Sequence, residues 1–234
     1  LSFKKNHLIL DNISLDISKG QVIGLLGPNG AGKSSLMNLI TGVIKPNFGN
    51  IIIDGKDITQ YPIYERTTKF KLSMCPQIGG YFSDLSAEDN LNAVGEILIK
   101  DSKLRKAKVE ELIFKFELDA VRKVEAKFLS GGMKRRLVIS MSLLGEPEIL
   151  LMDEPLAALD PQTIQMLQNI IIKLQSDYNL TIIITDHQAR DLLVVCDKAL
   201  ILSNSKIVAE GTPNELMKNE DATKHYFGEN FKFK

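Results

Sequence analysis

The chain has 234 residues, of which 44% are hydrophobic, and this is enough for one substantial core. Lys plus Arg and Asp plus Glu each number 29, so the formal net charge is zero, which argues against strong electrostatic binding to nucleic acid or to anionic lipid. No apolar run approaches the roughly 18 residues of a membrane span, so a membrane role would require another chain to cross the bilayer.

The first predicted elements surround a glycine-rich loop. Val22 to Leu26 is a short apolar run typical of a strand, and Leu36, Leu39 and Ile40 have helical spacing before Gly42. Between them lies Gly27-Pro28-Asn29-Gly30-Ala31-Gly32-Lys33-Ser34-Ser35. Glycines bring backbone N–H groups close to phosphates, a lysine adds positive charge, and a serine hydroxyl can ligate Mg²⁺. The loop predicts a nucleotide site. Alone it does not distinguish a kinase, a GTPase and a transporter ATPase, and a glycine-rich turn with a chance lysine is the simpler alternative.

The middle of the chain is expected to be mostly helical after a short β part. The elements predicted are a hairpin over residues 50–58 turned by Asp54-Gly55, a strand over Leu72 to Cys75 that leads to Gln77, a helix from Ser86 to Ile99, and a charged amphipathic helix from Lys103 to Phe116. Cys75 and Cys196 are isolated, so reduced thiols are expected and a CxxC metal motif is absent.

A second candidate anion site follows in Leu129-Ser130-Gly131-Gly132. This segment precedes a predicted amphipathic helix over Met133 to Leu144, with Ser130 as a good N-cap. Its glycines expose backbone N–H groups at a helix N-terminus, where anions bind. An ordinary capped helix with a flexible start is the alternative.

Two continuously apolar runs, Ile149 to Met152 and Thr181 to Thr185, are typical of parallel strands buried on both faces. Asp153 and Glu154 follow the first run and His187 follows the second. In open α/β sheets ligands bind beyond the carboxyl ends of the strands, so these residues and Gln77 are expected to converge on one nucleotide. Taken singly, a solvated histidine and turn-forming carboxylates are the simpler interpretation; the order and spacing of the motifs together favour the functional one.

In this order the motifs resemble the nucleotide-binding subunit of an ATP-binding-cassette (ABC) transporter, over nearly the whole chain. The resemblance implies an α/β fold of the P-loop NTPase type, with a RecA-like core, an antiparallel β part and a helical lobe. It implies a single domain over residues 1–234, divided into a catalytic core (1–80 and 131–203), a helical lobe (81–130) and a C-terminal hairpin with helices (204–234). ATP and Mg²⁺ are the implied cofactors.

The resemblance also implies a role for each motif. Asp153 matches the carboxylate that holds Mg²⁺ through water, with Ser34 and Gln77 as further Mg²⁺ residues. Glu154 matches the general base that positions the attacking water, and His187 matches the switch histidine near the γ-phosphate. The resemblance also implies that Gln77 senses Mg²⁺ and water and transmits the state of the site to the transport partner.

Further residues are implied to act between subunits. Two copies pack head to tail, so that Ser130, Gly131, Gly132 and Asp160 contact the partner's ATP. Met133 departs from the family pattern, which has Gln or Glu there. The loop containing Tyr81, Phe82 and Leu85 is expected to form part of the groove for a helix of each membrane subunit. Phe3 is expected to stack on adenine, and its closeness to the first residue predicts an N-terminally trimmed sequence.

The end of the chain narrows the resemblance. Glu210-Gly211-Thr212-Pro213 and the ending from Tyr226 to Phe231 look like the ATPase of the lipopolysaccharide-export transporter. The implied assembly is a homodimer under two transmembrane subunits, on the cytoplasmic face of the inner membrane and attached to it only through them. The ATPase of branched-chain amino acid importers is the alternative. ABC ATPases that act on DNA or ribosomes carry insertions, paired cassettes or basic arms that are absent here, so no nucleic-acid partner is expected.

Overall fold

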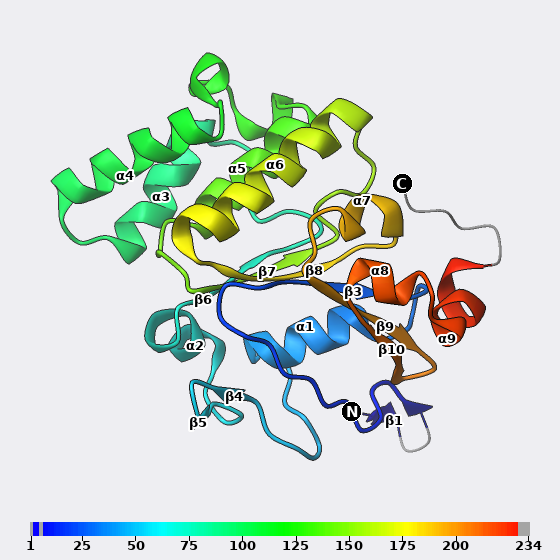
Figure 1. Ribbon diagram of the computed structural model, residues 1–234. Coiled ribbons are helices and arrows are strands. Elements are labelled where there is room, and N and C mark those ends of the chain that lie inside the picture. The colour runs from blue at the N-terminus through cyan, green and yellow to red at the C-terminus, as the bar shows by residue number, and fades with distance from the viewer. Residues whose placement is uncertain (1, 5–6, 229–234) are drawn as a thin grey trace.

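The computed structural model describes residues 2–4 and 7–228, and Figure 1 shows a central sheet with helices on both faces. The strands are β1 (Ser2–Lys4), β2 (His7–Leu8), β3 (Val22–Leu26), β4 (Ile52–Ile53), β5 (Lys56–Asp57), β6 (Leu72–Cys75), β7 (Ile149–Asp153), β8 (Thr181–Thr185), β9 (Lys198–Ser203) and β10 (Lys206–Gly211). The α-helices are α1 (Lys33–Thr41), α2 (Ile63–Lys69), α3 (Ala87–Leu98), α4 (Ser102–Lys115), α5 (Gly131–Ser142), α6 (Pro161–Tyr178), α7 (Ala189–Leu193), α8 (Pro213–Leu216) and α9 (Glu220–Ala222). Short 3₁₀ helices η1 (Asp119–Val121) and η2 (Ala126–Phe128) and a π-helical turn η3 (Thr223–Phe227) complete the described elements.

The main sheet has six strands in the order β10-β9-β3-β8-β7-β6. All neighbours pair in parallel except β10, which is antiparallel to β9. Thr185, near the end of β8, is in register with Leu25 of β3 and with Asp153 of β7. The carboxyl ends of these strands therefore meet at one edge of the sheet, which is where a ligand site is expected in an open α/β sheet.

Hydrophobic side chains fill both faces of this sheet, because successive residues of a strand point to opposite sides. On β3, Val22 and Leu26 belong to the core cluster that contains α5 and α6, whereas Ile23 and Leu25 pack with Leu36 of α1. In Figure 1, α1 lies on one face of the sheet and α5 to α7 lie on the other. The continuous apolar runs predicted as strands are thus buried on two sides.

The local turn and cap predictions are confirmed, with small differences in bounds. Asp54 and Gly55 join β4 and β5 with positive φ angles of 51° and 74°, the conformation of a tight hairpin turn. Ser86 caps α3 by accepting a hydrogen bond from the Asp89 N–H at 3.1 Å. Helix α5 begins at Gly131 rather than Met133, because Ser130 caps it and Gly131 and Gly132 both lie in its first turn.

The sequence analysis missed α2 and a buried arginine within it. Arg66 is 0% exposed and donates hydrogen bonds to the carbonyls of Leu39 and Ile40 at 2.7 and 2.8 Å. Burial lowers the pKa of this guanidinium. Because the last carbonyls of a helix lack partners within it, Arg66 closes the end of the helix that follows the glycine-rich loop.

The predicted α/β fold is confirmed, with a mostly parallel sheet and small antiparallel pairs formed by β1 with β2 and by β4 with β5. Helices α3 and α4 pack on each other and lie beyond the β6 side of the sheet (Figure 1). The division of the chain into core and lobe stays a prediction. Across residues 2–4 and 7–228, none of the helices combines the length and the apolar character needed to traverse a bilayer.

Candidate nucleotide-binding and hydrolysis site

The glycine-rich loop joins β3 to α1 in a conformation that needs glycine. Gly27 has a φ of +150°, and a side chain there would overlap the Leu202 carbonyl of the neighbouring strand. Gly32 has a φ of +104° and is the N-cap residue of α1. The loop therefore passes close to the sheet and delivers the N-terminal end of α1 to its edge, where the positive end of the helix favours an anion.

Lys33 lies inside this loop. Its side chain is only 6% exposed, and Nζ donates to the carbonyls of Gly27 at 2.7 Å and Pro28 at 3.1 Å. Burial lowers the pKa of Lys33, while the carboxylates of Glu154 and Asp153 act in the opposite direction. The ammonium group is thus held at the centre of the loop, close to the two acidic residues at the carboxyl end of β7. Ser34 is exposed on the first turn of α1.

Asp153, the last residue of β7, and Glu154, the residue after it, are both bonded to a threonine of β8. The Thr185 hydroxyl donates to Oδ1 of Asp153 at 2.5 Å, and it accepts a hydrogen bond from the Glu154 N–H at 3.0 Å. Asp153 is 7% exposed. Glu154 has a left-handed φ of +47°, so the chain turns sharply after the strand. The turn separates the two acidic side chains: one stays buried against β8, and the other is half-buried near the surface.

Glu154, Gln77 and His187 come together at the sheet edge, as predicted. Nε2 of Gln77 lies 2.6 Å from Oε2 of Glu154, and Nδ1 of His187 lies 3.5 Å from the same oxygen. Gln77 follows β6, Glu154 follows β7 and His187 follows β8. Gln77 and His187 are exposed. One carboxylate therefore faces a neutral amide and an imidazole beside open solvent, where a water molecule can reach it.

The main chain of His187 is held on both sides. Asp186 is 0% exposed and its Oδ1 accepts from the His187 N–H at 2.8 Å. The Tyr226 hydroxyl donates to the His187 carbonyl at 2.9 Å. Burial raises the pKa of Asp186, and it raises that of Tyr226 to about 12. The C-terminal segment therefore contacts the histidine loop directly, a contact the sequence analysis did not foresee.

Arg135 is a second residue that the sequence analysis did not single out. From α5 its guanidinium donates to the carbonyls of Pro76 at 2.9 Å, Gln77 at 3.1 Å and Glu154 at 3.1 Å. Arg135 lies five positions after Ser130 of the motif Leu129-Ser130-Gly131-Gly132, and this closeness is the one feature of the sequence that could have pointed to it.

The predicted inter-subunit residues lie at a second place on the surface. Ser130 and Asp160 are the N-caps of α5 and α6, and they accept hydrogen bonds from the N–H groups of Met133 and Thr163. With Gly132 they line a cavity of about 330 Å³ that Met133 also lines. Two helix N-termini thus open onto one cavity, and Gly131 is the first residue of α5.

Comparison with known proteins identifies the family. A family model described as "ABC transporter" matches residues 10–157. The Lipopolysaccharide export system ATP-binding protein LptB of Escherichia coli K12 is 36% identical over 231 residues, which cover 97% of this chain and 94% of that protein. The chain belongs to the ABC transporter family. It is an ATP hydrolase of this family, and the predicted resemblance is confirmed.

Solved structures agree with this assignment. The ADP conformation of MJ1267, an ATP-binding cassette of an ABC transporter, matches with a TM-score of 0.82 and 28% identity, over 94% of this chain and 93% of that one. A dimeric post-hydrolysis state of the cassette MJ0796, bound to ADP and phosphate, has a TM-score of 0.80 and 23% identity, covering 91% of this chain and 94% of that one. Both likenesses agree with the fold expected for the family.

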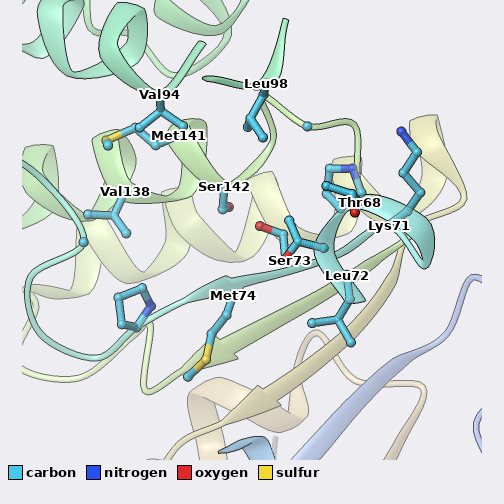
Figure 2. A pocket seen from close by; sticks show the side chains of 15 residues that line it. Thr68, Lys71, Leu72, Ser73, Met74, Val94, Leu98, Val138, Met141 and Ser142 are labelled. Carbon is cyan, nitrogen blue, oxygen red and sulfur yellow. The ribbon is translucent and has the colours of Figure 1, made fainter. Parts of the chain in front are cut away.

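This ABC ATPase also has a groove beside the Gln77 loop. It is a cavity of about 540 Å³. Figure 2 shows Val94 and Leu98 of α3 on one side of it and Met74 of β6 on another. Pro76 and Gly80, which flank the Gln77 loop, line it as well.

The three residues predicted for a partner groove do not line this cavity. Tyr81 is half-buried against the core cluster, whereas Phe82 and Leu85 are exposed. Their role stays a prediction. The backbone of Phe3 lies in β1, but its side chain is outside the described part of the structure, so adenine stacking also stays a prediction.

Proposed function

We propose that this chain hydrolyses ATP as one half of a head-to-tail dimer and drives lipopolysaccharide export from the inner membrane. One observation carries the hydrolytic part: the Glu154 carboxylate lies 2.6 Å from Gln77 and 3.5 Å from His187, at the sheet edge where Lys33 lies. A phosphate binder without hydrolytic activity has no need of this arrangement.

The residues divide the work of phosphoryl transfer to water. Lys33 and the N–H groups of the glycine-rich loop stabilise charge on the phosphates. Glu154 accepts a hydrogen bond from the water whose oxygen attacks the γ-phosphorus, and it takes up the proton as the bond to the β-phosphate oxygen breaks. Gln77 orients the Glu154 carboxylate, and the His187 imidazole, 3.5 Å from the same carboxylate, would contact the γ-phosphate.

Mg²⁺ fits the oxygen donors at this place. Mg²⁺ is typically held by one or two carboxylates together with substrate phosphates and water, rather than by a cage of protein ligands. Consistent with this, residues 2–4 and 7–228 contain no cluster of three or more His, Cys, Asp and Glu suited to a metal. Ser34, Asp153 and Gln77 would hold the ion, which when bound neutralises charge on the phosphates.

The dimer places two anion sites on one nucleotide. Ser130, Gly132 and Asp160 line a cavity formed by the starts of α5 and α6, away from the phosphate loop of the same chain. Helix N-termini favour anions, so these residues suit the γ-phosphate of an ATP carried by a second copy. The dimeric MJ0796 cassette, a structure of the same fold, supports this arrangement.

The cargo and the membrane partners are proposed from the resemblance to LptB. The groove between α3, α5 and β6 is partly apolar and adjoins the Gln77 loop, so it suits a short helix from a membrane subunit. Two such subunits would hold the dimer at the cytoplasmic face of the inner membrane. A partner docked there would sense the position of Gln77.

Two experiments test the proposal. Lys33→Ala should abolish tight ATP binding in a titration with a fluorescent nucleotide, and unchanged affinity would remove the phosphate-loop assignment.

For the cargo, the tagged chain is purified from native membranes, its partners are identified by mass spectrometry, and the complex is reconstituted with lipopolysaccharide. ATP-dependent release of lipopolysaccharide supports export. Hydrolysis stimulated instead by an amino-acid-binding protein would favour the importer alternative.

A further inference from the structure

Arg135 joins two catalytic loops through their main chain. Its guanidinium donates to the Gln77 and Glu154 carbonyls, each at 3.1 Å, while the side chains of the same two residues meet at 2.6 Å. A third bond, at 2.9 Å, goes to the carbonyl of Pro76. An arginine has five donors in a rigid planar fork, so one side chain can hold several carbonyls at fixed relative positions.

Glu154 depends on outside contacts for its conformation. Its φ of +47° is left-handed, which is unfavourable for a non-glycine residue and persists only where neighbouring groups hold it. Its N–H is bonded to Thr185 of β8, at 3.0 Å to both the carbonyl and the hydroxyl oxygen. Its carbonyl is bonded to Arg135 of α5. The peptide groups on the two sides of Glu154 are therefore fixed from different elements, β8 and α5.

Helix α5 also begins at the second candidate anion site, the segment Leu129-Ser130-Gly131-Gly132. Ser130 caps the helix, and Arg135 lies about 7.5 Å further along its axis at 1.5 Å per residue. Because a helix moves as a rigid body over such a distance, a shift of Ser130 toward a bound phosphate moves the Arg135 guanidinium as well.

We propose that Arg135 is a positioning residue that holds Glu154 and Gln77 in the geometry for hydrolysis, and that this geometry depends on the position of helix α5. The inference rests on the proposed function, in which Glu154 positions the attacking water. Arg135 itself touches neither the water nor the phosphates. It acts through the main chain of Gln77 and Glu154, so that ATP held at the start of α5 aligns the base that Arg135 contacts from the same half of the helix.

The test compares Arg135→Met, which keeps the aliphatic length but has no donors, with Arg135→Lys, which keeps the charge and part of the donor capacity. Lys134→Met is the matched control, since it removes the same charge from the same helical turn. The hydrogen bond of Lys134 goes to the Lys127 carbonyl, away from both catalytic loops. Each full-length protein is assayed for ATP affinity, kcat, KM and amide hydrogen exchange.

Arg135→Met should lower kcat about tenfold or more, because a small misplacement of a catalytic group is costly, while KM and ATP affinity change less than about twofold. Amide exchange should accelerate in residues 76–80 and 153–157 and stay unchanged in the glycine-rich loop. Arg135→Lys should recover part of kcat, and Lys134→Met should match the unmodified protein. If Arg135→Met does not fold, the Arg135→Lys variant carries the same comparison with a smaller effect.

Unchanged kcat or unchanged exchange in Arg135→Met would overturn the inference, as would an equal loss in Lys134→Met. A loss confined to ATP affinity would also overturn it, since it would place Arg135 in binding. If the unmodified protein hydrolyses no ATP, the proposed function itself is wrong. If the unmodified protein and the Arg135→Met variant are equally active, only the inference about Arg135 is wrong.

Discussion

The Gln77 amide lies 2.6 Å from the Glu154 carboxylate, so the loops that follow β6 and β7 are joined by their side chains. A carboxylate has about four lone-pair positions, so one bond to Gln77 leaves capacity to accept from water. The contact orients the base without occupying it. The Gln77 loop also borders the groove beside α3 and α5, so a movement of the loop at the groove would shift the Glu154 carboxylate.

Glu154→Gln tests the base. The substitution keeps the size of the side chain and removes the carboxylate that accepts the proton, so turnover should fall about 10²-fold or more. ATP affinity should be retained, because Lys33 and the glycine-rich loop are unchanged. The variant should accumulate as an ATP-bound dimer in size-exclusion chromatography with ATP. Near-normal hydrolysis would remove Glu154 from this role.

Ser130→Ala tests the second anion site. The Ser130 side chain accepts from the Met133 N–H at 3.2 Å, so its loss should destabilise the start of α5 by about 1 kcal/mol and weaken ATP-driven dimerisation. ATP binding by the isolated monomer should not change. Ser140→Ala is the control, because that hydroxyl bonds to the Leu137 carbonyl within the same helix. Weaker monomer binding in Ser130→Ala would contradict a site for the partner's nucleotide.

Tyr226→Phe tests the contact between the C-terminal segment and the histidine loop. It removes only the hydroxyl that donates to the His187 carbonyl, a hydrogen bond worth about 1 kcal/mol. We expect a several-fold lower kcat with ATP affinity unchanged. Tyr178→Phe serves as control, because Tyr178 is exposed and its hydroxyl has hydrogen-bond partners on α4, away from the histidine loop. Equal kcat in the Tyr226→Phe variant and the unmodified protein would show that the contact does not serve hydrolysis.

The same variant has a defined pH dependence. Burial raises the pKa of Tyr226 to about 12, so the folded protein holds this proton more tightly than the unfolded chain, in which the pKa is about 10. The resulting stabilisation is fully present below pH about 10 and is lost as the pH rises through about 12. The difference in unfolding free energy between the unmodified protein and Tyr226→Phe should therefore be constant below pH about 10 and shrink above it. A difference that changes between pH 6 and 9 would point to another group.

The sequence predicts the elements whose environment is uniform along the chain. Val22–Leu26 and Thr181–Thr185 have the predicted bounds and are buried along their whole length, since a strand covered on both faces is mostly apolar. Leu72–Cys75 also has the predicted bounds, although it is an edge strand that is fully buried only at its two ends. The convergence of Gln77, Glu154 and His187 follows from the same reasoning, because each lies one or two residues beyond the carboxyl end of β6, β7 or β8, which are neighbours in the sheet.

Contacts that join distant positions could not be predicted in this way. Arg135 meets the Gln77 carbonyl across 58 positions, and Tyr226 meets His187 across 39. Each is a polar side chain bonded to a main-chain carbonyl, and any residue type offers that carbonyl. The residue that offers the carbonyl therefore carries no sequence pattern that predicts the contact, and only the folded structure shows it.

Phe82→Ala tests the exposed loop after Gln77 as a contact for the membrane subunits. Phe82 is 52% exposed, and large exposed aromatics are frequent anchors of interfaces. Its backbone is fixed independently of its ring, since the buried Asn90 side chain bonds to the Phe82 N–H at 2.7 Å and to its carbonyl at 3.0 Å. The loop should therefore keep its shape in the variant, and the ATPase activity of the isolated subunit should stay largely intact.

Binding to the membrane subunits should weaken in Phe82→Ala by about 2 kcal/mol or more if the ring is a hot spot, and co-purification from membranes should fall accordingly. Phe128→Ala is the matched control, because that ring is 72% exposed on η2 and lies outside the Gln77 loop. Loss of assembly in Phe82→Ala alone would extend the docking surface from the groove to this loop. Normal assembly would confine docking to the groove lined by Val94, Leu98 and Met74. Unfolding of the variant would instead give the ring a role in the core, against its 52% exposure in the structure.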